Sequence, residues 1–382
     1  MTSHSIRTRR PAISGIGATA FGVFPGEDAY SLGSTALRAA MREANVKAGE
    51  IDGLIVCRIA DYQRFGELHG LNPQFAVNLP GQGRMAAIAL QMACQAIASG
   101  AVNTVALVYG NDGRSAGMKY GGEGDGYGSG GAGLWFPYGM TSPGAVHAMM
   151  FRRYEHLYGD AGDALAKVAL TCRQHAVLNP GAVMKKTYTI DEYYASKYIA
   201  APLRLFDYCL INDGGIALIV TSAERARDAP GKPVYVAGVA TATHLADSTF
   251  APDDFWYGAM RRAAAALEAQ AGIAPKETDA TMIYDNFTPT VLFSMEGFGI
   301  CARGEAAEYV RAADLGLTGR QPLNTSGGHL SESYMQGWGL MTEAVRQIRG
   351  ECGARQLNKA DNILYTCASP ICSGAIFSSE AA

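Results

Sequence analysis

Apolar segments of strand length alternate with segments of helical periodicity along most of the chain. Residues 12–21 are apolar and punctuated by glycine, residues 31–44 carry apolar side chains at helical spacing, and residues 51–56 form a second apolar run. An Ala- and Met-rich stretch at 85–99 leads directly into another apolar run at 104–109. Continuous apolar runs between helices are typical of strands in a sheet covered on both faces. The pattern predicts an α/β fold.

The same order of elements returns in the second part of the chain. An apolar, glycine-punctuated segment is followed by helix, strand, helix and strand, at residues 234–240, 257–271, 280–284, 341–349 and 363–366. This order indicates the duplication of one supersecondary unit. We therefore expect an N-terminal half at 1–230 and a C-terminal half at 231–382.

A glycine-dense segment interrupts the rhythm of the first half. Residues 113–133 are poor in aliphatic side chains and too long for an ordinary connection. Gly128-Ser-Gly-Gly-Ala-Gly133 fits GxGxxG, but no strand precedes it and no helix signal follows, so a dinucleotide site is not expected. We interpret residues 113–205 as a region inserted in the first half, whose start covers an active site.

The composition excludes several classes of protein. The chain has 382 residues, of which 48% are hydrophobic and 18% charged, as in globular enzymes. The formal net charge of -3 from 32 basic and 35 acidic residues gives no basic surface for nucleic acid. Apolar runs such as 85–90 are far shorter than the roughly 20 residues that span a bilayer. Residues 1–10 lack the apolar core of a signal peptide, so we expect a cytoplasmic protein.

The cysteines give no sign of a metal site or of disulfides. Eight cysteines are scattered along the chain without a CxxC pair, mostly in apolar surroundings. This distribution favours reduced thiols in the core. No cluster of His, Cys and Asp has metal-ligand spacing. We therefore expect no metal and no tightly bound cofactor.

Five short motifs follow one another along nearly the whole chain. They are Gly15-Ile-Gly17, Gln95-Ala-Ile-Ala-Ser-Gly100, Asp207-Tyr-Cys-Leu-Ile-Asn-Asp-Gly214, Tyr284-Asp-Asn-Phe287, and Asn324-Thr-Ser-Gly-Gly328 with Gly337. In this order and spacing they resemble the thiolase superfamily, nearest to its lipid-transfer/SCP2-thiolase branch. The resemblance implies the thiolase fold, with five layers αβαβα, two similar halves and a loop region inserted in the first. It also implies a homodimer and acyl-CoA thioester substrates.

The cysteine that accepts the acyl group in this family is missing. The family places it at the start of a buried helix, where the helix dipole favours the thiolate. The motif that ends at Gly100 puts this position at Gly83. Residues 58–93 contain no Cys, Ser or Thr, and Cys94 falls deep inside the predicted helix. Covalent acyl transfer through this position is therefore excluded.

Tyrosines stand where the family carries its two catalytic histidines. Tyr284 opens the second family motif, and Tyr334 stands in Ser333-Tyr-Met-Gln-Gly337, where the family has Gly-His-Pro-x-Gly. A tyrosine can donate or accept a proton, so the pair fits general acid/base chemistry. The pattern resembles the thiolase-like aldolases that remove steroid side chains. It implies retro-aldol cleavage of a β-hydroxyacyl-CoA to a ketone or aldehyde and a shorter acyl-CoA.

Other polar residues are weaker candidates for substrate contacts. Gly83, Arg84 and Gly328 are candidates for holding the thioester oxygen, by position at a helix start and a glycine turn. His147 and His329 are candidates for touching the substrate. Asp285 either orients Tyr284 or caps a helix.

Two alternatives to the aldolase stay open. One is an acyltransferase with Cys367 or Cys372 as its nucleophile, since both flank the place of the last family motif. The other is a non-catalytic subunit that binds acyl-CoA. The resemblance also implies a small partner protein with a zinc ribbon and an OB-like domain. We expect the homodimer to form through a sheet edge at residues 104–109. The acyl group, and which tyrosine is the base, are not fixed by the sequence.

We expect the substitution Gly83→Cys to leave the fold intact and to create no useful thiolase activity. Both histidines that manage the protons in a thiolase are absent, so a new thiol alone does not restore the reaction. The measurement is thiolysis of acetoacetyl-CoA by the variant and by the wild type. Robust thiolysis by either protein would contradict this interpretation of the site.

Overall fold

The structure is a computed structural model that describes residues 10–118, 139–140, 142–245 and 252–381. The strands are β1 (Pro11–Ala18), β2 (Gly53–Cys57), β3 (Phe75–Leu79), β4 (Thr104–Asn111), β5 (Tyr198–Ala200), β6 (Leu203–Arg204), β7 (Gly214–Ser222), β8 (Val234–Thr243), β9 (Ala280–Ile283), β10 (Asn362–Cys367) and β11 (Ile371–Ser378). The helices are α2 (Ala29–Ala44), α3 (Tyr62–His69), α4 (Met85–Ala98), α5 (Pro143–Tyr158), α6 (Gly162–Val177), α7 (Ile190–Ala195), α8 (Ala223–Arg227), α9 (Tyr257–Ala271), α10 (Thr288–Gly297), α11 (Ala306–Ala312), α12 (Gly328–Ser331) and α13 (Trp338–Arg349). The GxGxxG match at 128–133 lies outside the described residues.

Nine strands form one mixed sheet in the order β3-β2-β4-β7-β1-β8-β11-β10-β9. In the first half β3, β2 and β4 are parallel, and β7 and β1 follow in antiparallel pairing. In the second half β9 and β10 are parallel, and β11 and β8 follow in antiparallel pairing. The halves meet where β1 pairs with β8, through Ala12 with Tyr235 and Ile13 with Val234. The chain therefore has two similar halves, while the domain boundary at residue 230 stays a prediction.

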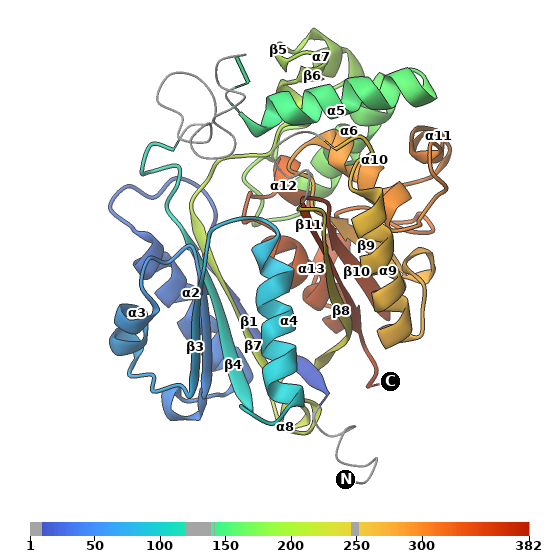
Figure 1. Ribbon diagram of the computed structural model, residues 1–382. Coiled ribbons are helices and arrows are strands. Elements are labelled where there is room, and N and C mark those ends of the chain that lie inside the picture. The colour runs from blue at the N-terminus through green and yellow to red at the C-terminus, as the bar shows by residue number, and fades with distance from the viewer. Residues whose placement is uncertain (1–9, 119–138, 141, 246–251, 382) are drawn as a thin grey trace.

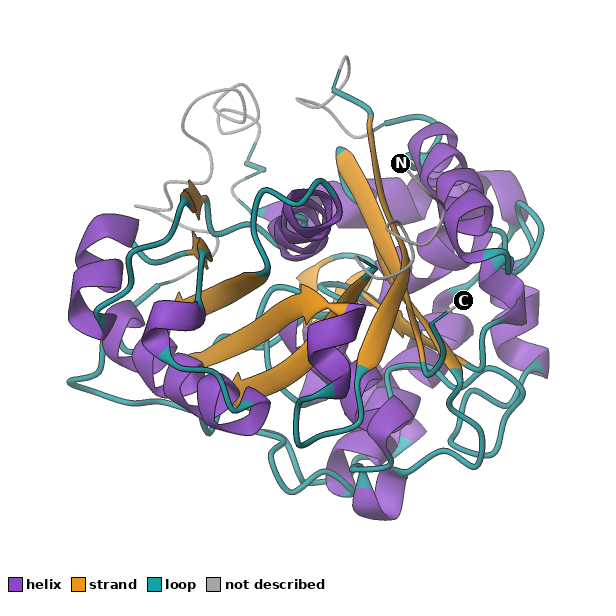
Figure 2. Ribbon diagram, turned by 90° about the horizontal axis from the view of Figure 1, so that it is seen from below, coloured by secondary structure: helices purple, strands orange, loops and turns teal. Residues whose placement is uncertain are grey.

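Helices and half-sheets alternate in layers (Figure 1). The helices α2 and α3 cover the outer face of the first half-sheet, α4 and α13 lie between the half-sheets, and α9 covers the outer face of the second. Seen from below, helices flank the strands on both sides (Figure 2). Separate clusters of buried apolar side chains fill the spaces between these layers: one around Phe65 under the first outer helices, one around Trp338 on both sides of the central helices, and one around Phe293 on the side of α9. The five-layer α/β arrangement is the one the sequence predicts.

Two glycines of β1 let the first helix lie directly on the sheet. A Cβ atom on Gly15 would lie 2.4 Å from the carbonyl oxygen of Ala40, and one on Gly17 would lie 2.0 Å from that of Ala36. Both carbonyls belong to α2, which begins at an Asp28 cap and ends at Asn45 in the left-handed region. Any side chain at either glycine would push α2 off the sheet. The Gly15-Ile-Gly17 motif therefore has a packing cause.

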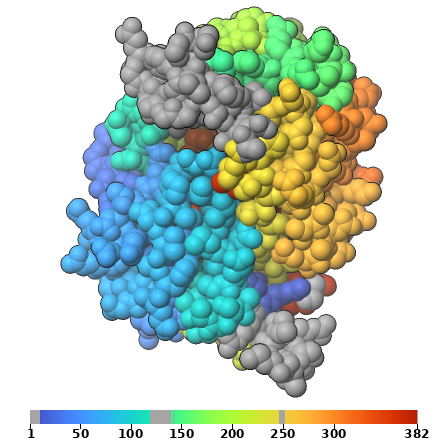
Figure 3. Space-filling model, viewed as in Figure 1, coloured from blue at the N-terminus to red at the C-terminus, as the bar shows by residue number. Residues whose placement is uncertain are grey.

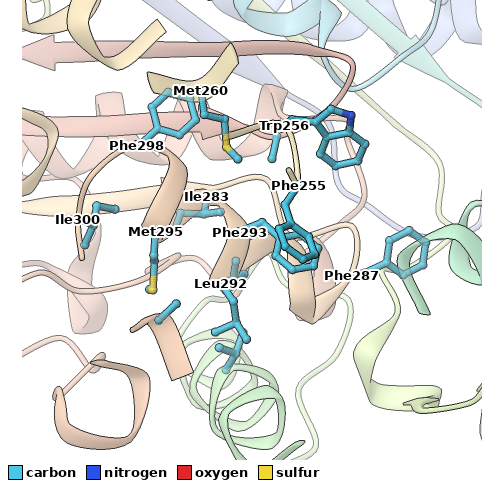
Figure 4. Packing of buried hydrophobic residues seen from close by; sticks show 14 of the residues in the cluster. Phe255, Trp256, Met260, Ile283, Phe287, Leu292, Phe293, Met295, Phe298 and Ile300 are labelled. Atoms are coloured by element: carbon cyan, nitrogen blue, oxygen red, sulfur yellow. The ribbon is translucent and has the colours of Figure 1, made fainter. Parts of the chain in front are cut away.

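The segment between β4 and β7 packs on the second half of the chain. It carries α5, α6 and α7 and the small β5–β6 pair, above the main sheet in Figure 1. Tyr154 of α5 donates a hydrogen bond of 2.6 Å to Glu296 of α10. Phe255 and Phe293 of the same apolar cluster stack at 4.9 Å between ring centroids (Figure 4). The inserted region therefore continues the core of the second half.

The expected sheet edge at residues 104–109 is wrong. These residues belong to β4, which pairs with β2 on one side and β7 on the other and is fully buried. The edge of the first half-sheet is β3. Residues 104–109 form a continuous apolar run, which is typical of a central strand buried on both faces and not of an edge strand.

The described residues add two further findings. None of their helices has the length and apolar character of a membrane-spanning segment. Their His, Cys, Asp and Glu side chains do not gather in a group of three that could hold a metal ion.

Candidate active site

The structure brings the two predicted tyrosines together. Tyr284 directly follows β9, and its backbone N–H donates to the carbonyl of Thr366. Tyr334 lies in the turn between α12 and α13, and its backbone N–H donates to Asn212 Oδ1 over 2.7 Å. The two hydroxyls form a hydrogen bond of 2.8 Å. Residues fifty positions apart in sequence thus present one pair of phenols.

Gly83 lies directly against the hydroxyl of Tyr284. A Cβ atom on Gly83 would lie 1.9 Å from Tyr284 Oη and 2.1 Å from Cζ of the same ring. The phenol therefore fills the space that a cysteine side chain at position 83 would need. The substitution Gly83→Cys therefore forces Tyr284 or the start of α4 to move. That the fold as a whole stays intact remains a prediction.

His329 packs against both tyrosine rings. Its ring centroid lies 4.6 Å from that of Tyr284 and 5.2 Å from that of Tyr334, both in edge-on geometry. Its Nε2 accepts a hydrogen bond of 3.0 Å from the N–H of Gly337. Its Nδ1 lies 3.1 Å from Asp285 Oδ1, although the angle does not complete a hydrogen bond. Both nitrogens face protein groups, so His329 positions the tyrosines.

Asp285 caps a short helix and does not touch the Tyr284 hydroxyl. Its carboxylate accepts the backbone N–H of His329 at 2.8 Å and that of Leu330 at 3.4 Å. Gly328, in the left-handed region with φ of 60°, packs so closely that a Cβ would lie 2.2 Å from Asp285 Oδ2. The Gly328 N–H donates to Ser326 Oγ over 3.4 Å. Asp285 and Gly328 therefore serve the turn that carries His329.

Burial sets the protonation of Tyr284. Its side chain is 4% exposed, and burial, followed by the nearby Tyr334, raises its pKa well above the usual range of a phenol. Tyr284 therefore keeps its proton at neutral pH. Either hydroxyl can donate in the hydrogen bond between them, and Tyr284 is the donor whenever Tyr334 is ionised.

The two cysteines near the last family motif are poor nucleophiles. Cys367 ends β10 and Cys372 lies at the start of β11, and both are buried. Burial raises the pKa of the Cys367 thiol, with Arg84 acting against this shift. Burial also raises the pKa of Cys372 to about 12, and its thiol donates to the carbonyl of Ser369. Neither is a thiolate at neutral pH.

His147 packs against other aromatic side chains. Its Nδ1 donates to the carbonyl of Pro143 over 2.8 Å, and its ring lies 4.3 Å from Phe287 and 6.1 Å from Trp256. Burial lowers the pKa of His147 to about 4, so the ring is neutral at pH 7. Figure 4 shows Phe287 and Trp256 at the edge of a cluster of buried apolar side chains. His147 packs against both of these aromatic rings.

Sequence reasoning missed three residues around the pair. Asn212 holds the backbone of Tyr334, and Gln336 donates through Nε2 to the carbonyl of Gly81, which ties the Tyr334 turn to the start of α4. Arg58 follows β2 and faces the same region. The position of Arg58 after a parallel strand was the available signal, because ligands gather at the carboxyl ends of such strands.

The surface is hollowed above this part of the fold. Figure 3 shows a depression between the cyan segment that includes α4 and the yellow segment that includes α9, with C-terminal residues in dark red at its floor. The helix α4 begins at Met85, directly after Gly83 and Arg84. The start of a helix carries unpaired N–H groups and a partial positive charge, which suit a developing oxyanion.

We expect Gly83→Ala to lower the free energy of unfolding by about 1–3 kcal/mol, as overpacking does. The added methyl group collides with the ring of Tyr284. In a Tyr284→Ala background the same substitution should cost much less, because the ring is gone. Urea denaturation of the four proteins of this double-mutant cycle measures the coupling. Additive costs would show that the two residues do not compete for one space.

Comparison with known proteins places the chain among relatives of one kind. A family model described as "Thiolase C-terminal domain-like" matches residues 241–378. The chain is 34% identical to the steroid side-chain-cleaving aldolase of Thermomonospora curvata, over 93% of this chain and 94% of that protein. It is 33% identical to the 17-hydroxy-3-oxo-4-pregnene-20-carboxyl-CoA lyase of Mycobacterium tuberculosis, over 89% of this chain and 91% of that protein.

A solved structure shows the same similarity in three dimensions. The Ltp2-ChsH2(DUF35) aldolase superposes with a TM-score of 0.88 at 33% identity, covering 97% of this chain and 98% of that chain. The predicted thiolase fold and the predicted resemblance to side-chain-cleaving aldolases are both confirmed by these matches. This chain belongs to the thiolase superfamily, among its thiolase-like aldolases.

Proposed function

We propose that this chain cleaves the Cα–Cβ bond of a β-hydroxyacyl-CoA by a retro-aldol reaction, giving a ketone or aldehyde and a shorter acyl-CoA. The observation that carries the proposal is the 2.8 Å hydrogen bond between Tyr284 and Tyr334, formed beside Gly83 where a thiolase would hold its cysteine. The names of the two bacterial relatives, an aldolase and a CoA lyase, support the same reaction class.

The geometry favours Tyr334 as the base. Tyr284 is buried and keeps its proton, whereas Tyr334 is half-buried, so a negative charge on Tyr334 would accept a hydrogen bond from Tyr284. In this scheme the Tyr334 phenolate takes the proton from the substrate hydroxyl. The Cα–Cβ electrons move into the thioester enolate, and Tyr284 then gives its proton to Cα. Proton transfer along the hydrogen bond from Tyr334 to Tyr284 restores the starting state.

The thioester itself accepts the charge of the broken bond. An enolate oxygen near the start of α4 would meet the helix N-terminus at Gly83 and Arg84. We propose these residues as the oxyanion site. The reaction as written needs no covalent intermediate and no CoA as a second substrate, so free CoA should not be required.

The alternative acyltransferase is disfavoured by the state of its thiols. Cys367 and Cys372 are both buried, and burial raises the pKa of each thiol. The second alternative is a non-catalytic subunit that binds acyl-CoA. Binding alone does not require two hydrogen-bonded phenols beside a glycine, so this alternative leaves the tyrosine pair unexplained. We propose a steroid acyl-CoA with a β-hydroxyl group as the first substrate to test, because the mycobacterial relative is named for such a compound.

We also propose two kinds of partner. The first is a second copy of this chain, which would pair along β3, the edge strand of the first half-sheet. An apolar edge strand such as Phe75–Leu79 is a template for pairing with another chain. The second is a small protein with a zinc ribbon and an OB-like domain. The joint name of the Ltp2-ChsH2(DUF35) aldolase supports an assembly with a second protein.

We expect Tyr284→Phe and Tyr334→Phe each to lower the rate of β-hydroxyacyl-CoA cleavage by about 10²–10⁴-fold, the usual cost of losing a general acid or base. Each substitution removes one hydroxyl and almost no ring volume, so stability should change little. Cleavage is followed by mass spectrometry of the shorter acyl-CoA, with and without the partner protein. Acyl-CoA binding, measured by calorimetry, should survive in both variants.

The same experiment decides between the readings of the site. Cleavage at the wild-type rate by both variants would make the tyrosines structural. Retained acyl-CoA binding with no cleavage by the wild type would favour the binding subunit. A requirement for free CoA would favour the acyltransferase.

We expect Val77→Lys to convert the homodimer into a monomer. Val77 lies in the middle of β3, and a charged side chain on an edge strand opposes pairing with another chain. Sedimentation velocity at micromolar protein concentration measures the change. Glu67→Lys on the exposed face of α3 adds the same side chain away from the edge and is the control for charge. Because Val77 also packs against the buried cluster around Trp338, urea denaturation of both variants separates loss of the dimer from loss of stability. A monomeric wild type would contradict the proposed dimer.

A further inference from the structure

Arg58 holds a backbone conformation that arginine rarely adopts. It directly follows β2, and its φ of 61° lies in the left-handed region. A non-glycine residue is disfavoured there relative to the right-handed region, because its Cβ approaches the following carbonyl oxygen. Such a residue persists only where its surroundings fix it, and it is a reason to look for a functional role.

Two glycines fix the direction of the Arg58 side chain. A Cβ on Gly81 would lie 2.9 Å from Arg58 Cγ, and a Cβ on Gly113 would lie 3.0 Å from Arg58 Nη2. The aliphatic stem therefore lies on one glycine and the guanidinium on the other. Nη2 also lies 3.3 Å from the sulfur of Met118. Among the described residues, no carboxylate forms an ion pair with Arg58.

Arg58 and Tyr334 both line one small cavity. Its volume of about 10 Å³ is enough for roughly one water molecule. Asn111 and Asn212 complete its polar wall, joined by a 2.7 Å hydrogen bond from Asn111 Nδ2 to the carbonyl of Asn212. Asn212 in turn holds the backbone of Tyr334. Arg58 thus brings a permanent positive charge to the wall of a cavity that Tyr334 also lines.

We propose that Arg58 is a positioning residue that stabilises the phenolate of Tyr334 across this cavity and so makes Tyr334 the base of the reaction. The inference rests on the proposed function. A phenol needs a donor and a cation to act as a base near neutral pH. Tyr284 supplies the donor and Arg58 supplies the cation. Arginine suits the task because it does not lose its charge in a protein.

The other groups around Tyr334 do not replace this charge. Tyr284 and Tyr365 are buried phenols, and burial raises the pKa of both well above the usual range. The ring nitrogens of His329 face Gly337 and Asp285. The carboxyl of Glu332, two residues before Tyr334, hydrogen-bonds to Ser326 and Asn179, and its pKa is raised to about 7 by burial and then by Glu343. Arg84 precedes α4 beside Gly83 and is not among the residues that line this cavity. Arg58 is the cation among the described residues of the cavity wall.

The test is the pH dependence of cleavage by wild type, Arg58→Met and Arg58→Lys. The rate rises with pH as the base loses its proton. Loss of the cation disfavours the phenolate, so the rise should move to higher pH by about one unit in Arg58→Met. At pH values below this rise, Arg58→Met should cleave the substrate about tenfold more slowly than the wild type, and at higher pH its rate should reach the wild-type rate. Arg58→Lys keeps the charge and should keep most of the wild-type profile. Arg114→Met, which removes the same charge from an exposed nearby side chain, is the control.

A second measurement does not depend on activity. In protein labelled with [ζ-¹³C]tyrosine, the NMR signal that disappears in Tyr334→Phe belongs to Tyr334. Its titration should move to higher pH in Arg58→Met and stay in place in Arg114→Met. An unchanged titration, or a rate lowered equally at every pH, would overturn the role of Arg58 while leaving the aldolase reaction standing. If the Tyr334 titration moves in Arg58→Met but the wild type cleaves no β-hydroxyacyl-CoA, the result would support the role of Arg58 and refute the aldolase reaction.

Discussion

The close approach of a phenol to a helix start is the constraint on which the site depends. Tyr284 reaches so near to residue 83 that only glycine fits there. The thiol of a thiolase and the phenol of this chain compete for the same volume, so the two chemistries exclude each other sterically. The loss of the nucleophilic cysteine is therefore coupled to the gain of Tyr284. A larger residue at position 83 collides with the Tyr284 ring, and a smaller residue at position 284 leaves a void beside Gly83.

The surrounding residues form a rigid support for this contact. Asp285 caps the turn that carries His329, His329 packs against both phenol rings, and Asn212 holds the backbone of Tyr334. Each of these side chains is buried, and Asp285, Asn212 and the Nε2 atom of His329 hydrogen-bond within the protein. Side chains whose own contacts are satisfied can hold reacting groups within a narrow range of positions. The support comes from both halves of the chain, so the site forms only when the halves are joined.

The sequence predicted the fold and the tyrosine pair well, because both rest on residues in fixed motif positions. The α/β pattern, the two halves and the thiolase fold follow from periodicity and motif order. The clash at Gly83 could not be predicted, because it depends on the distance between a strand end and a helix start far apart in the chain. The edge strand was missed for a similar reason. The apolar character of residues 104–109 predicts a strand, but hydrophobicity does not predict the order of strands in the sheet. His329 and Asp285 lie where expected, yet their hydrogen bonds give them supporting positions.

The state of the cysteines has a consequence for the conditions that the protein tolerates. Burial raises the pKa of all eight thiols, from Cys57 in β2 to Cys372 in β11. Peroxides and alkylating agents attack thiolates, so none of these side chains offers them a fast target. An enzyme of this fold that works through a cysteine is poisoned by such reagents at its reactive centre. The proposed site, which is built on phenol oxygens, offers such reagents no thiolate to attack.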